Sequence, residues 1–267
     1  MKAGGAFPAR GPDVRRVALT VLGLTAVLFY SAGCAMAANT NGLSEAQIQG
    51  RQLARELLEQ WPATNFTQTG VLKIRDGDGH RSEVPVKFEI FVTAANWLSV
   101  YDASRGATNR TILKIVHRDA TPNDYQLAET NNPDGIPARF AALNGEQTMI
   151  PFAGSDFWVA DLGLEFLHWP EQKLLKREFK RGCGCRVLES INPHPSPNGY
   201  SRVVAWIDNE TGGIVQAEGY DARGKLLKEF FPKSFKKVNG QWELQEMEIR
   251  NKPAGSRTRL EFDLSKE

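Results

Sequence analysis

The sequence contains few cysteines, three among 267 residues. One of them, Cys34, lies in an N-terminal leader, which leaves Cys183 and Cys185 for the rest of the chain. Two cysteines are too few to staple a small disulfide scaffold, so the fold must depend on a hydrophobic core. The composition fits that requirement, because 41% of the residues are hydrophobic and 24% are charged, as in ordinary globular proteins.

A strong net charge of one sign is also missing. Residues 1–37 hold four of the 33 basic and one of the 31 acidic residues, so the remainder has a formal net charge of −1. Proteins that bind nucleic acid generally carry a basic patch or stripe that neutralises phosphates. The balance of charges therefore argues against a nucleic-acid partner.

Motifs for catalysis or cofactor binding are absent from the sequence. There is no phosphate-binding glycine loop and no serine nucleophile elbow. Residues 76–79 resemble the start of a calcium loop but lack its later ligands, so a hairpin turn is the favoured interpretation. The histidines have no metal-ligand spacing; they are His80, His117, His168 and His194. We predict a protein that is not an enzyme and has no metal or cofactor.

Long hydrophobic runs are limited to one, at residues 17–30. It follows a basic leader and precedes small residues, which is the layout of a secretory signal peptide. The run is shorter than the roughly 20 residues that a membrane-spanning helix requires, so we favour export over an uncleaved anchor. The prediction is a signal peptide at residues 1–37 and a periplasmic protein.

Two cleavage sites compete at the end of this leader. Ala35-Met36-Ala37 has the small-x-small pattern of ordinary signal peptidase, and we favour cleavage after Ala37. Ser31-Ala32-Gly33-Cys34 resembles a bacterial lipobox, although lipoboxes usually have leucine at the position of Ser31. Lipidation of Cys34 would instead give a membrane-anchored lipoprotein.

The pair Cys183 and Cys185 has three interpretations. On a regular strand the two side chains point to the same face, with Cα atoms about 6.6–6.8 Å apart, at the edge of disulfide range. A strained disulfide or a metal-binding thiol pair is compatible with that spacing. We favour two small buried residues at the start of a strand, because free cysteine is a frequent core residue.

The pattern of the remaining chain is mostly that of short strands. Ser44 and Gln47 have the spacing of a capping box and predict a helix over residues 44–60, which Pro62 ends. Turn residues then separate short alternating runs. We expect strands at 70–75, 84–91, 96–101, 111–117, 174–180, 185–190, 200–208, 214–220, 225–231, 233–238, 241–250 and 258–264. Many strands at short spacing favour a curved antiparallel sheet or barrel.

Three stretches depart from simple alternation. Residues 120–150 are polar and contain several prolines, which predicts an irregular excursion rather than a domain boundary. Residues 155–169 begin with a Ser-Asp pair that can cap a helix and end before a proline, which predicts a bulky amphipathic helix. Within 241–250 the apolar positions change phase, which predicts a one-residue β-bulge.

The second half of the chain contains an ordered set of motifs. They are Gly154-Ser-Asp-Phe157 with Asp161-Leu162, Cys185-Arg-Val-Leu-Glu189, Tyr200-Ser-Arg-Val-Val204 with Trp206-Ile-Asp208, Glu218-Gly-Tyr-Asp221 with Gly224-Lys-Leu-Leu-Lys228, and Met247-Glu-Ile-Arg250 with Thr258-Arg-Leu-Glu261. In this order they resemble the bacterial outer-membrane lipoprotein-sorting proteins, the family similar to the periplasmic carrier LolA. The resemblance spans about residues 150–264, and the helix and hairpin that begin near Ser44 are compatible with it.

The resemblance implies a strongly curved antiparallel sheet that forms an incomplete barrel closed by a few helices, here as one domain over residues 38–267. It implies a carrier or chaperone that binds lipid or lipoprotein acyl chains in an apolar groove, with membrane sorting proteins as further partners. Candidates for the groove and its lid are Trp97, Phe152, Phe157, Trp158, Leu162 and Phe166. For each of them plain core packing is the simpler role.

A second hypothesis is an envelope-associated regulatory or structural protein that binds a protein partner. An apolar groove would favour the carrier. A filled barrel with an exposed hydrophobic patch would favour partner binding. An envelope hydrolase would need a polar pocket with converging titratable groups, which the sequence does not predict.

Overall fold

The fold is known from a computed structural model, which describes residues 42–106, 109–118, 121–131, 139–238 and 241–264. The predicted signal peptide, both cleavage sites and Cys34 lie outside the described residues. In the part of the chain that is described, no helix combines the length and the apolar character needed to cross a membrane.

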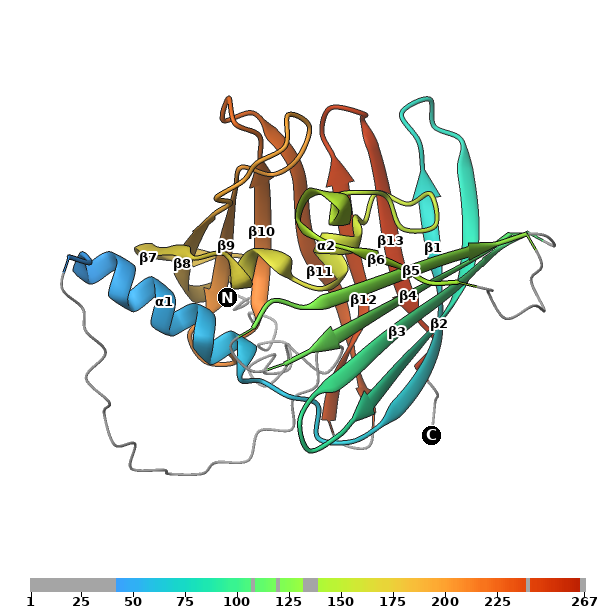
Figure 1. The fold of residues 1–267 in the computed structure, drawn as a ribbon, viewed down its shortest axis with the longest axis horizontal. Helices are drawn as coiled ribbons and strands as arrows, with labels where there is room; N and C mark the ends of the chain where they lie inside the picture. The colour runs from blue at the N-terminus through green and yellow to red at the C-terminus, as the bar shows by residue number, and fades with distance from the viewer. Residues whose placement is uncertain (1–41, 107–108, 119–120, 132–138, 239–240, 265–267) are drawn as a thin grey trace, which may run out of the picture.

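Thirteen described strands form one antiparallel sheet (Figure 1). They are β1 (Phe66–Arg75), β2 (Arg81–Val92), β3 (Trp97–Arg105), β4 (Asn109–His117), β5 (Asp124–Thr130), β6 (Ala141–Leu143), β7 (Glu171–Lys180), β8 (Cys183–Ile191), β9 (Arg202–Asp208), β10 (Ile214–Tyr220), β11 (Leu226–Val238), β12 (Gln241–Asn251) and β13 (Ser256–Phe262). Their order is β6-β5-β4-β3-β2-β1-β13-β12-β11-β10-β9-β8-β7, so β6 and β7 are the open edges. The predicted fold class, an incomplete antiparallel barrel with few helices, is confirmed.

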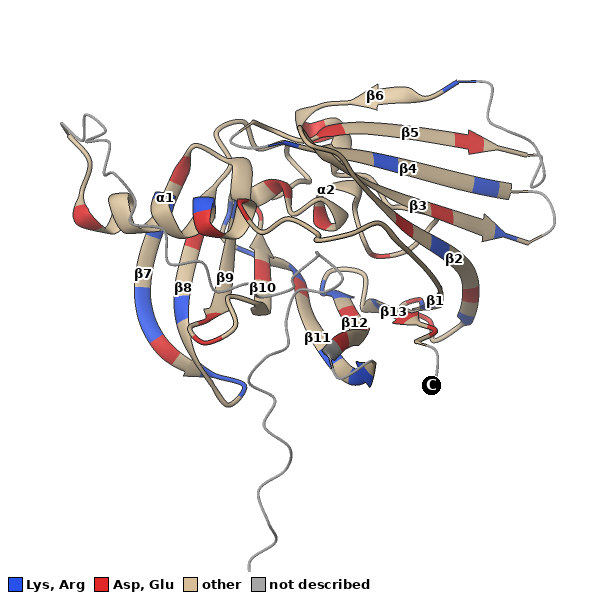
Figure 2. Ribbon diagram, turned by 90° about the horizontal axis from the view of Figure 1, so that it is seen from below, with Lys and Arg blue, Asp and Glu red and all other residues tan. Residues whose placement is uncertain are grey.

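The sheet bends so that its two ends lie on either side of the short helix α2 (Val159–Leu162) (Figure 2). Its concave side carries two clusters of buried side chains. One cluster joins β1–β4, β12 and β13 to residues 152–162, and the other joins β8–β10 to residues 166–169 and the long helix α1 (Glu45–Leu58). Residues 152–169, which we call the inner segment, therefore contact both ends of the sheet from inside.

Helix α1 begins and ends close to its predicted positions. Ser44 and Gln47 form the expected capping box, which satisfies backbone N–H groups at the helix start. Leu53 and Leu57 are buried on the face that meets the sheet. Gly50 lies so close to β7 that an added Cβ would be 2.5 Å from the Cα of Lys173, so only glycine allows this approach.

The predicted helix at 155–169 is wrong in extent. The structure has α2, then Gly163 and Leu164, then a 3-10 turn, η3 (Glu165–His168). Leu164 has φ +48°, a left-handed conformation that interrupts a helix. Asp156 does not cap the helix, because its carboxylate accepts hydrogen bonds from Ser256 and Thr258 of β13. Hydrogen bonds to a distant strand thus take the place of the predicted helix cap.

Other sequence expectations had mixed outcomes. The stretch 120–150 is not simply irregular, because β5 pairs with β4, β6 pairs with β5, and a 3-10 turn, η2 (Gly145–Thr148), follows. The two strands predicted at 225–231 and 233–238 are one strand, β11, which continues through Pro232 with a register shift. The predicted bulge is confirmed: Phe235 pairs with Leu244 and Ser234 with Glu246, which leaves Gln245 as the extra residue of β12.

Candidate functional site

The inner segment is held by side chains that bond to its backbone. The amide nitrogen of Gln172, on β7, donates to the carbonyl oxygens of Phe166 at 2.9 Å, Leu167 at 3.4 Å and Trp169 at 2.8 Å. Ser190 donates to Gln172 Oε1 at 2.6 Å and fixes the amide orientation. These bonds satisfy carbonyls at the end of η3 that have no partner within so short a turn.

Strand β5 holds the segment from the opposite end of the sheet. Asn123, just before β5, donates from Nδ2 to the carbonyl oxygen of Gly163 at 2.8 Å. The hydroxyl of Tyr125 donates to Glu165 Oε2 at 2.8 Å. Burial raises the pKa of the Glu165 carboxyl, and the Tyr125 hydrogen bond opposes that rise. The turn at Gly163 and Leu164 is thus anchored on both sides.

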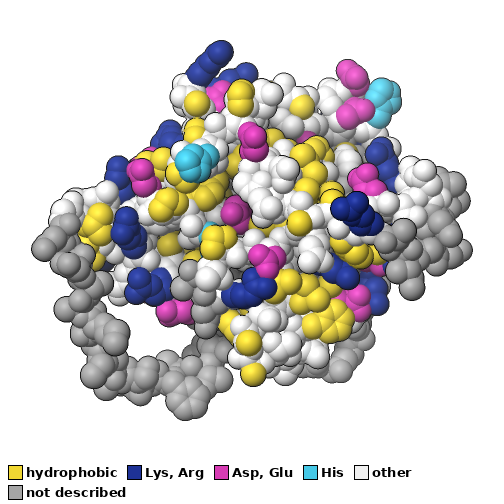
Figure 3. Space-filling model, viewed as in Figure 1, with side chains coloured by type: hydrophobic (Ala, Val, Ile, Leu, Met, Phe, Trp, Pro, Cys, Tyr) yellow, Lys and Arg dark blue, Asp and Glu magenta, His cyan; other side chains and the backbone are white. Residues whose placement is uncertain are grey.

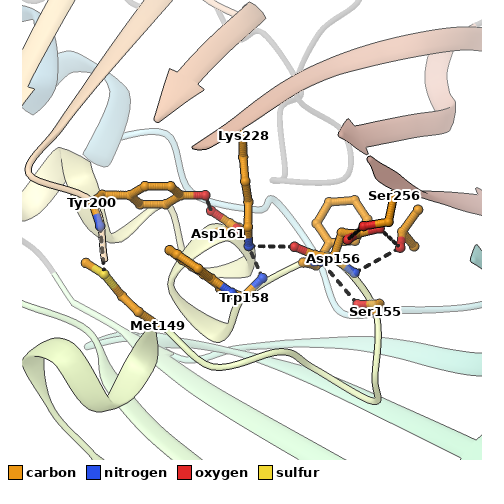
Figure 4. Close-up of polar contacts among 10 residues, drawn as sticks. Met149, Ser155, Asp156, Trp158, Asp161, Tyr200, Lys228 and Ser256 are labelled. Atoms are coloured by element: carbon orange, nitrogen blue, oxygen red, sulfur yellow. Dashed lines mark hydrogen bonds and ion pairs between the residues drawn. The ribbon is translucent and has the colours of Figure 1, made fainter. Parts of the chain in front are cut away.

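A buried lysine anchors the start of the inner segment (Figure 4). Lys228 on β11 is 3% exposed, and its Nζ donates to the Asp156 carbonyl oxygen at 2.6 Å. The same ammonium lies 3.4 Å from Asp161 Oδ2 and 3.5 Å from the centroid of the Trp158 ring. Tyr200 donates to the other Asp161 oxygen at 2.9 Å. Burial lowers the pKa of Lys228 to about 8, and the negative charge of Asp161 opposes this lowering.

Two cavities lie on either side of this anchored turn. The first, which we call the lysine cavity, lies between the inner segment and the concave faces of β9–β12 and has a volume of about 40 Å³. Apolar atoms dominate its wall, and the residues used below are Leu164, Phe166, Val203, Ala217, Lys228 and Phe230.

The second, which we call the histidine cavity, also has a volume of about 40 Å³. It lies between α1, the ends of β3 and β4, and the inner segment, and its lining includes Gln60, Trp97, His117, Asn123, Leu164 and His168. The rings of Trp97 and His117 stack with centroids 3.6 Å apart and planes 6° apart. Leu164 lines both cavities.

Both imidazoles of the histidine cavity are neutral near pH 7. Burial lowers the pKa of His117 to about 3; the charge of His168 adds to that shift, and Asn123 opposes it. Burial lowers the pKa of His168 to about 4. His117 Nε2 lies 3.0 Å from the hydroxyl of Ser99. The cavity therefore offers uncharged nitrogen atoms and aromatic surface.

The surface seen in Figure 3 mixes hydrophobic side chains with charges of both signs where grey atoms do not cover it. Four large hydrophobic side chains are strongly exposed among the described residues: Phe91, Ile150, Leu175 and Phe179. Phe179, on the edge strand β7, is 83% exposed.

Comparison with known proteins relates this geometry to solved structures. A DUF1329 family protein from Desulfovibrio piger is 20% identical, with a TM-score of 0.64 over 82% of this chain and 92% of that one. A putative outer membrane lipoprotein-sorting protein domain from Vibrio parahaemolyticus is 22% identical, with a TM-score of 0.63 over the same shares. A LolA superfamily protein from Nitrosomonas europaea is 15% identical, with a TM-score of 0.51 over 83% and 93%.

The fold is that of the LolA-like lipoprotein-sorting proteins. The predicted resemblance is thereby confirmed at the level of the fold. A family model described as "Uncharacterized protein" matches residues 138–266, just under half of the chain, which includes the motifs. No curated protein matches the sequence.

Three residues predicted for the groove of this LolA-like fold lie at or beside the cavities. Trp97 lines the histidine cavity, Phe166 lines the lysine cavity, and Trp158 covers the Lys228 ammonium. The other three belong to the cluster of β1–β4, β12 and β13: Phe152 and Phe157 are 1% exposed and Leu162 is 5% exposed. Ligand contact for any of the six stays a prediction.

Sequence reasoning missed the polar members of the site. His117 and His168 looked scattered because they are distant in the sequence, and only the sheet brings them together. One feature of the sequence could have indicated Lys228. It alternates with Phe230 on the face of β11 that points into the sheet's concave side, where an apolar residue is expected. The left-handed backbone of Leu164 could not be predicted from the sequence, because glycine or asparagine is the residue expected in that conformation.

The remaining candidates lie away from the cavities. Cys183 and Cys185 are free thiols at the start of β8, and Cys185 packs with Val187 and Trp206 on the other face of the sheet. Burial is the main cause that raises the pKa of both thiols, to about 11 for Cys185. The loop at 76–80 is the predicted hairpin turn between β1 and β2, and the Asp76 carboxylate accepts from the His80 backbone N–H.

Proposed function

We propose that this protein is a periplasmic carrier or chaperone that binds the acyl chains of lipoproteins for sorting to the outer membrane. The observation that carries the proposal is the inner segment, a turn that separates two apolar cavities on the concave side of a LolA-like sheet. Cargo would be held without covalent chemistry, in the space between the two ends of the sheet.

The closed form has no room for a lipid chain. Each cavity holds about 40 Å³, enough for a few water-sized groups, whereas a palmitoyl chain is many times larger. Leu164 is the natural gate, because moving it joins the two cavities. Its left-handed backbone stores about 1 kcal/mol of strain that displacement would release.

An acyl chain and the inner segment would compete for the concave face of the sheet. Burying ten methylene groups contributes roughly 8 kcal/mol, at about 0.8 kcal/mol each. Each hydrogen bond from Gln172, Asn123 or Tyr125 to the inner segment contributes about 1 kcal/mol net. An entering acyl chain would therefore offset the hydrogen bonds that are lost when the turn at Gly163 and Leu164 moves, whereas the buried side chains of the segment oppose a larger displacement.

Two substitutions at one position test this proposal. Leu164→Asp places a charge between the cavities, in a left-handed conformation that aspartate tolerates. Leu164→Gly relieves the same backbone strain but keeps the space apolar. Binding of a synthetic tripalmitoylated cysteinyl peptide is measured by native mass spectrometry, with circular dichroism as the check of folding.

We expect the wild type to bind the lipopeptide, Leu164→Gly to bind it at least as tightly, and Leu164→Asp to bind it at least about 10-fold more weakly. Failure of the folded wild type to bind would reject the carrier function. Equal binding by all three proteins would place the cargo elsewhere on the molecule. The mass of the exported protein, read in the same experiment, distinguishes cleavage after Ala37 from lipidation at Cys34.

A second candidate function is the binding of a protein partner. Phe179 and Leu175 are exposed on β7, an edge strand of the sheet formed by the described residues, and such an edge can accept a strand from another chain. A photo-crosslinking amino acid in place of Phe179 should form one discrete adduct with another protein in cells. The same amino acid in place of Phe91, on β2, should form none. Adducts of equal intensity at both positions would argue against a partner on this edge.

A further inference from the structure

The histidine cavity contains buried oxygen atoms that lack a hydrogen-bond donor. Gln60 Oε1 and Asn123 Oδ1 are both buried without a donor in full hydrogen-bonding geometry among the described residues, and the Asn123 side chain also interacts with the His117 ring. Both residues line the same cavity. Burying an acceptor without a donor is unfavourable, so two such atoms at one cavity are positioned to receive a hydrogen-bond donor.

The orientation of Asn123 is set by the inner segment. The side chain is 6% exposed, and its Nδ2 donates to the Gly163 carbonyl oxygen at 2.8 Å and contacts the Tyr125 hydroxyl at 3.2 Å. Because a carbonyl can only accept, the amide cannot turn over without losing that bond. Asn123 Oδ1 must therefore face the cavity beside the His117 ring.

The rest of the wall is suited to a neutral donor. His117 and His168 are uncharged near pH 7, so neither repels a neutral group nor neutralises an anion. Trp97 and His117 provide a stacked aromatic surface. Arg118, at the rim, is already paired with Asp124 at 2.5 Å. A carboxylate would be disfavoured here because its oxygens would face other acceptor oxygens. An N–H group attached to an apolar chain could instead donate a hydrogen bond to those oxygens.

We infer that the histidine cavity is a recognition site for the amide N–H at the head of an N-acyl chain, with Gln60 and Asn123 as its acceptors. The inference rests on the proposed function and deepens it. N-acylated peptides carry such an amide, whereas acyl esters of glycerol do not. The protein would therefore prefer N-acyl over O-acyl lipids.

The position of Leu164 explains how one ligand reaches both cavities. The two acceptor oxygens are buried, and Leu164 lines both their cavity and the lysine cavity. When Leu164 moves, the two cavities become continuous. The chain then occupies the lysine cavity against Val203 and Ala217, and its amide head meets Asn123 and Gln60.

Two probes that differ by one group test the inference. N-(2-hydroxyethyl)palmitamide carries an amide N–H, and 2-hydroxyethyl palmitate carries an ester oxygen in its place. Gln60→Met removes the unpaired amide oxygen at similar volume. Gln68→Met is the matched control, because Gln68 Oε1 is also buried without a donor but lies on β1, away from the cavity. Titration calorimetry gives the affinity of each protein for each probe.

We expect the wild type and Gln68→Met to prefer the amide by about 10-fold, and Gln60→Met to reduce that preference to about 3-fold or less with the ester affinity unchanged. Equal affinity of the wild type for both probes would overturn the amide site and leave the carrier function standing. A preference that Gln60→Met leaves intact would also overturn it. Absence of binding by either probe would overturn both proposals.

Discussion

At the scale of single residues, polar groups rather than apolar ones distinguish the concave face. Lys228 occupies an inward position of β11, where an aliphatic side chain would cost less to bury. Its ammonium is satisfied by Asp161, by the Asp156 carbonyl and by the face of Trp158. Each of these groups belongs to the inner segment, so the lysine fixes where that segment lies on the sheet.

Replacing Lys228 should therefore destabilise the protein. We expect Lys228→Met to lower the free energy of unfolding by about 3 kcal/mol, because the negative charge of the half-buried Asp161 loses its cation. Adding Asp161→Asn removes that charge and should recover part of the loss. Urea denaturation measures both values. A Lys228→Met protein as stable as the wild type would show that the lysine does not anchor the segment.

His117 predicts the response to acid. Its pKa is about 3 in the folded protein, below the ordinary 6.5, so between these pH values the unfolded chain binds a proton that the folded protein does not. The contribution of His117 to stability is therefore fully present above pH 6.5 and is lost toward pH 3, by up to about 1.4 kcal/mol per pH unit. His168, with a pKa of about 4, adds to the same trend.

The variant His117→Phe keeps an aromatic ring against Trp97 and removes the titrating group. We expect the loss of stability between pH 6.5 and pH 4 to become shallower in this variant, as measured by urea denaturation at several pH values. His194→Gln changes an exposed histidine and serves as the control. If the free energy of unfolding falls equally with pH in the wild type and in His117→Phe, His117 is not the cause of the loss of stability in acid.

At the scale of elements, α1 depends on one glycine for its approach to the sheet. Replacing a helical glycine by alanine usually stabilises a protein by about 0.5–1 kcal/mol. At Gly50 the new Cβ would lie 2.5 Å from backbone atoms of Lys173, which cannot rotate away. The helix would have to shift off β7, and the packing of Leu53 and Leu57 would suffer.

We thus expect Gly50→Ala to lower the free energy of unfolding by about 1–3 kcal/mol, opposite in sign to the usual helix effect. Thermal and urea denaturation measure it. Gln52→Ala, on the exposed side of the same helix, should change stability by less than about 0.5 kcal/mol. A more stable Gly50→Ala protein would show that α1 can move without cost.

At the scale of the whole molecule, β13 joins the two halves of the sheet. It pairs with β1 on one side and β12 on the other, so the last strand of the chain holds the first hairpin against β7–β12. Leu260, 1% exposed, pairs with Leu72 and Met247 at this junction. One domain over residues 38–267, which the family resemblance implies, remains our prediction, and this pairing agrees with it.

Unfolding should accordingly be a single cooperative transition. We expect Leu260→Ala to lower the free energy of unfolding by about 2–5 kcal/mol. The midpoint of the unfolding transition should move by the same amount whether it is followed by far-ultraviolet circular dichroism or by tryptophan fluorescence. Both halves contribute to these signals, because Trp97 lies on β3 and Trp206 on β9. Two separate transitions would show that the halves are independent units.

Local patterns in the sequence were sufficient for most of the sheet. Alternation and turn residues placed the hairpin of β1 and β2, the later strands and the bulge near Gln245, because these features depend on neighbours along the chain. The same reasoning failed at 155–169. There the Ser-Asp pair predicts a helix cap, whereas the Asp156 carboxylate accepts hydrogen bonds from β13, about 100 residues away.

The sequence by itself determined the fold class, the first helix and the ordered motifs of a lipoprotein-sorting fold, since each depends on periodicity or on residues close together in the chain. Only the tertiary structure decided the site. The histidine cavity joins Gln60, His117, Asn123 and His168 from four separate segments, and Lys228 acquires its partners from across the sheet. A curved sheet determines which distant side chains meet, and that curvature results from the packing of the whole molecule.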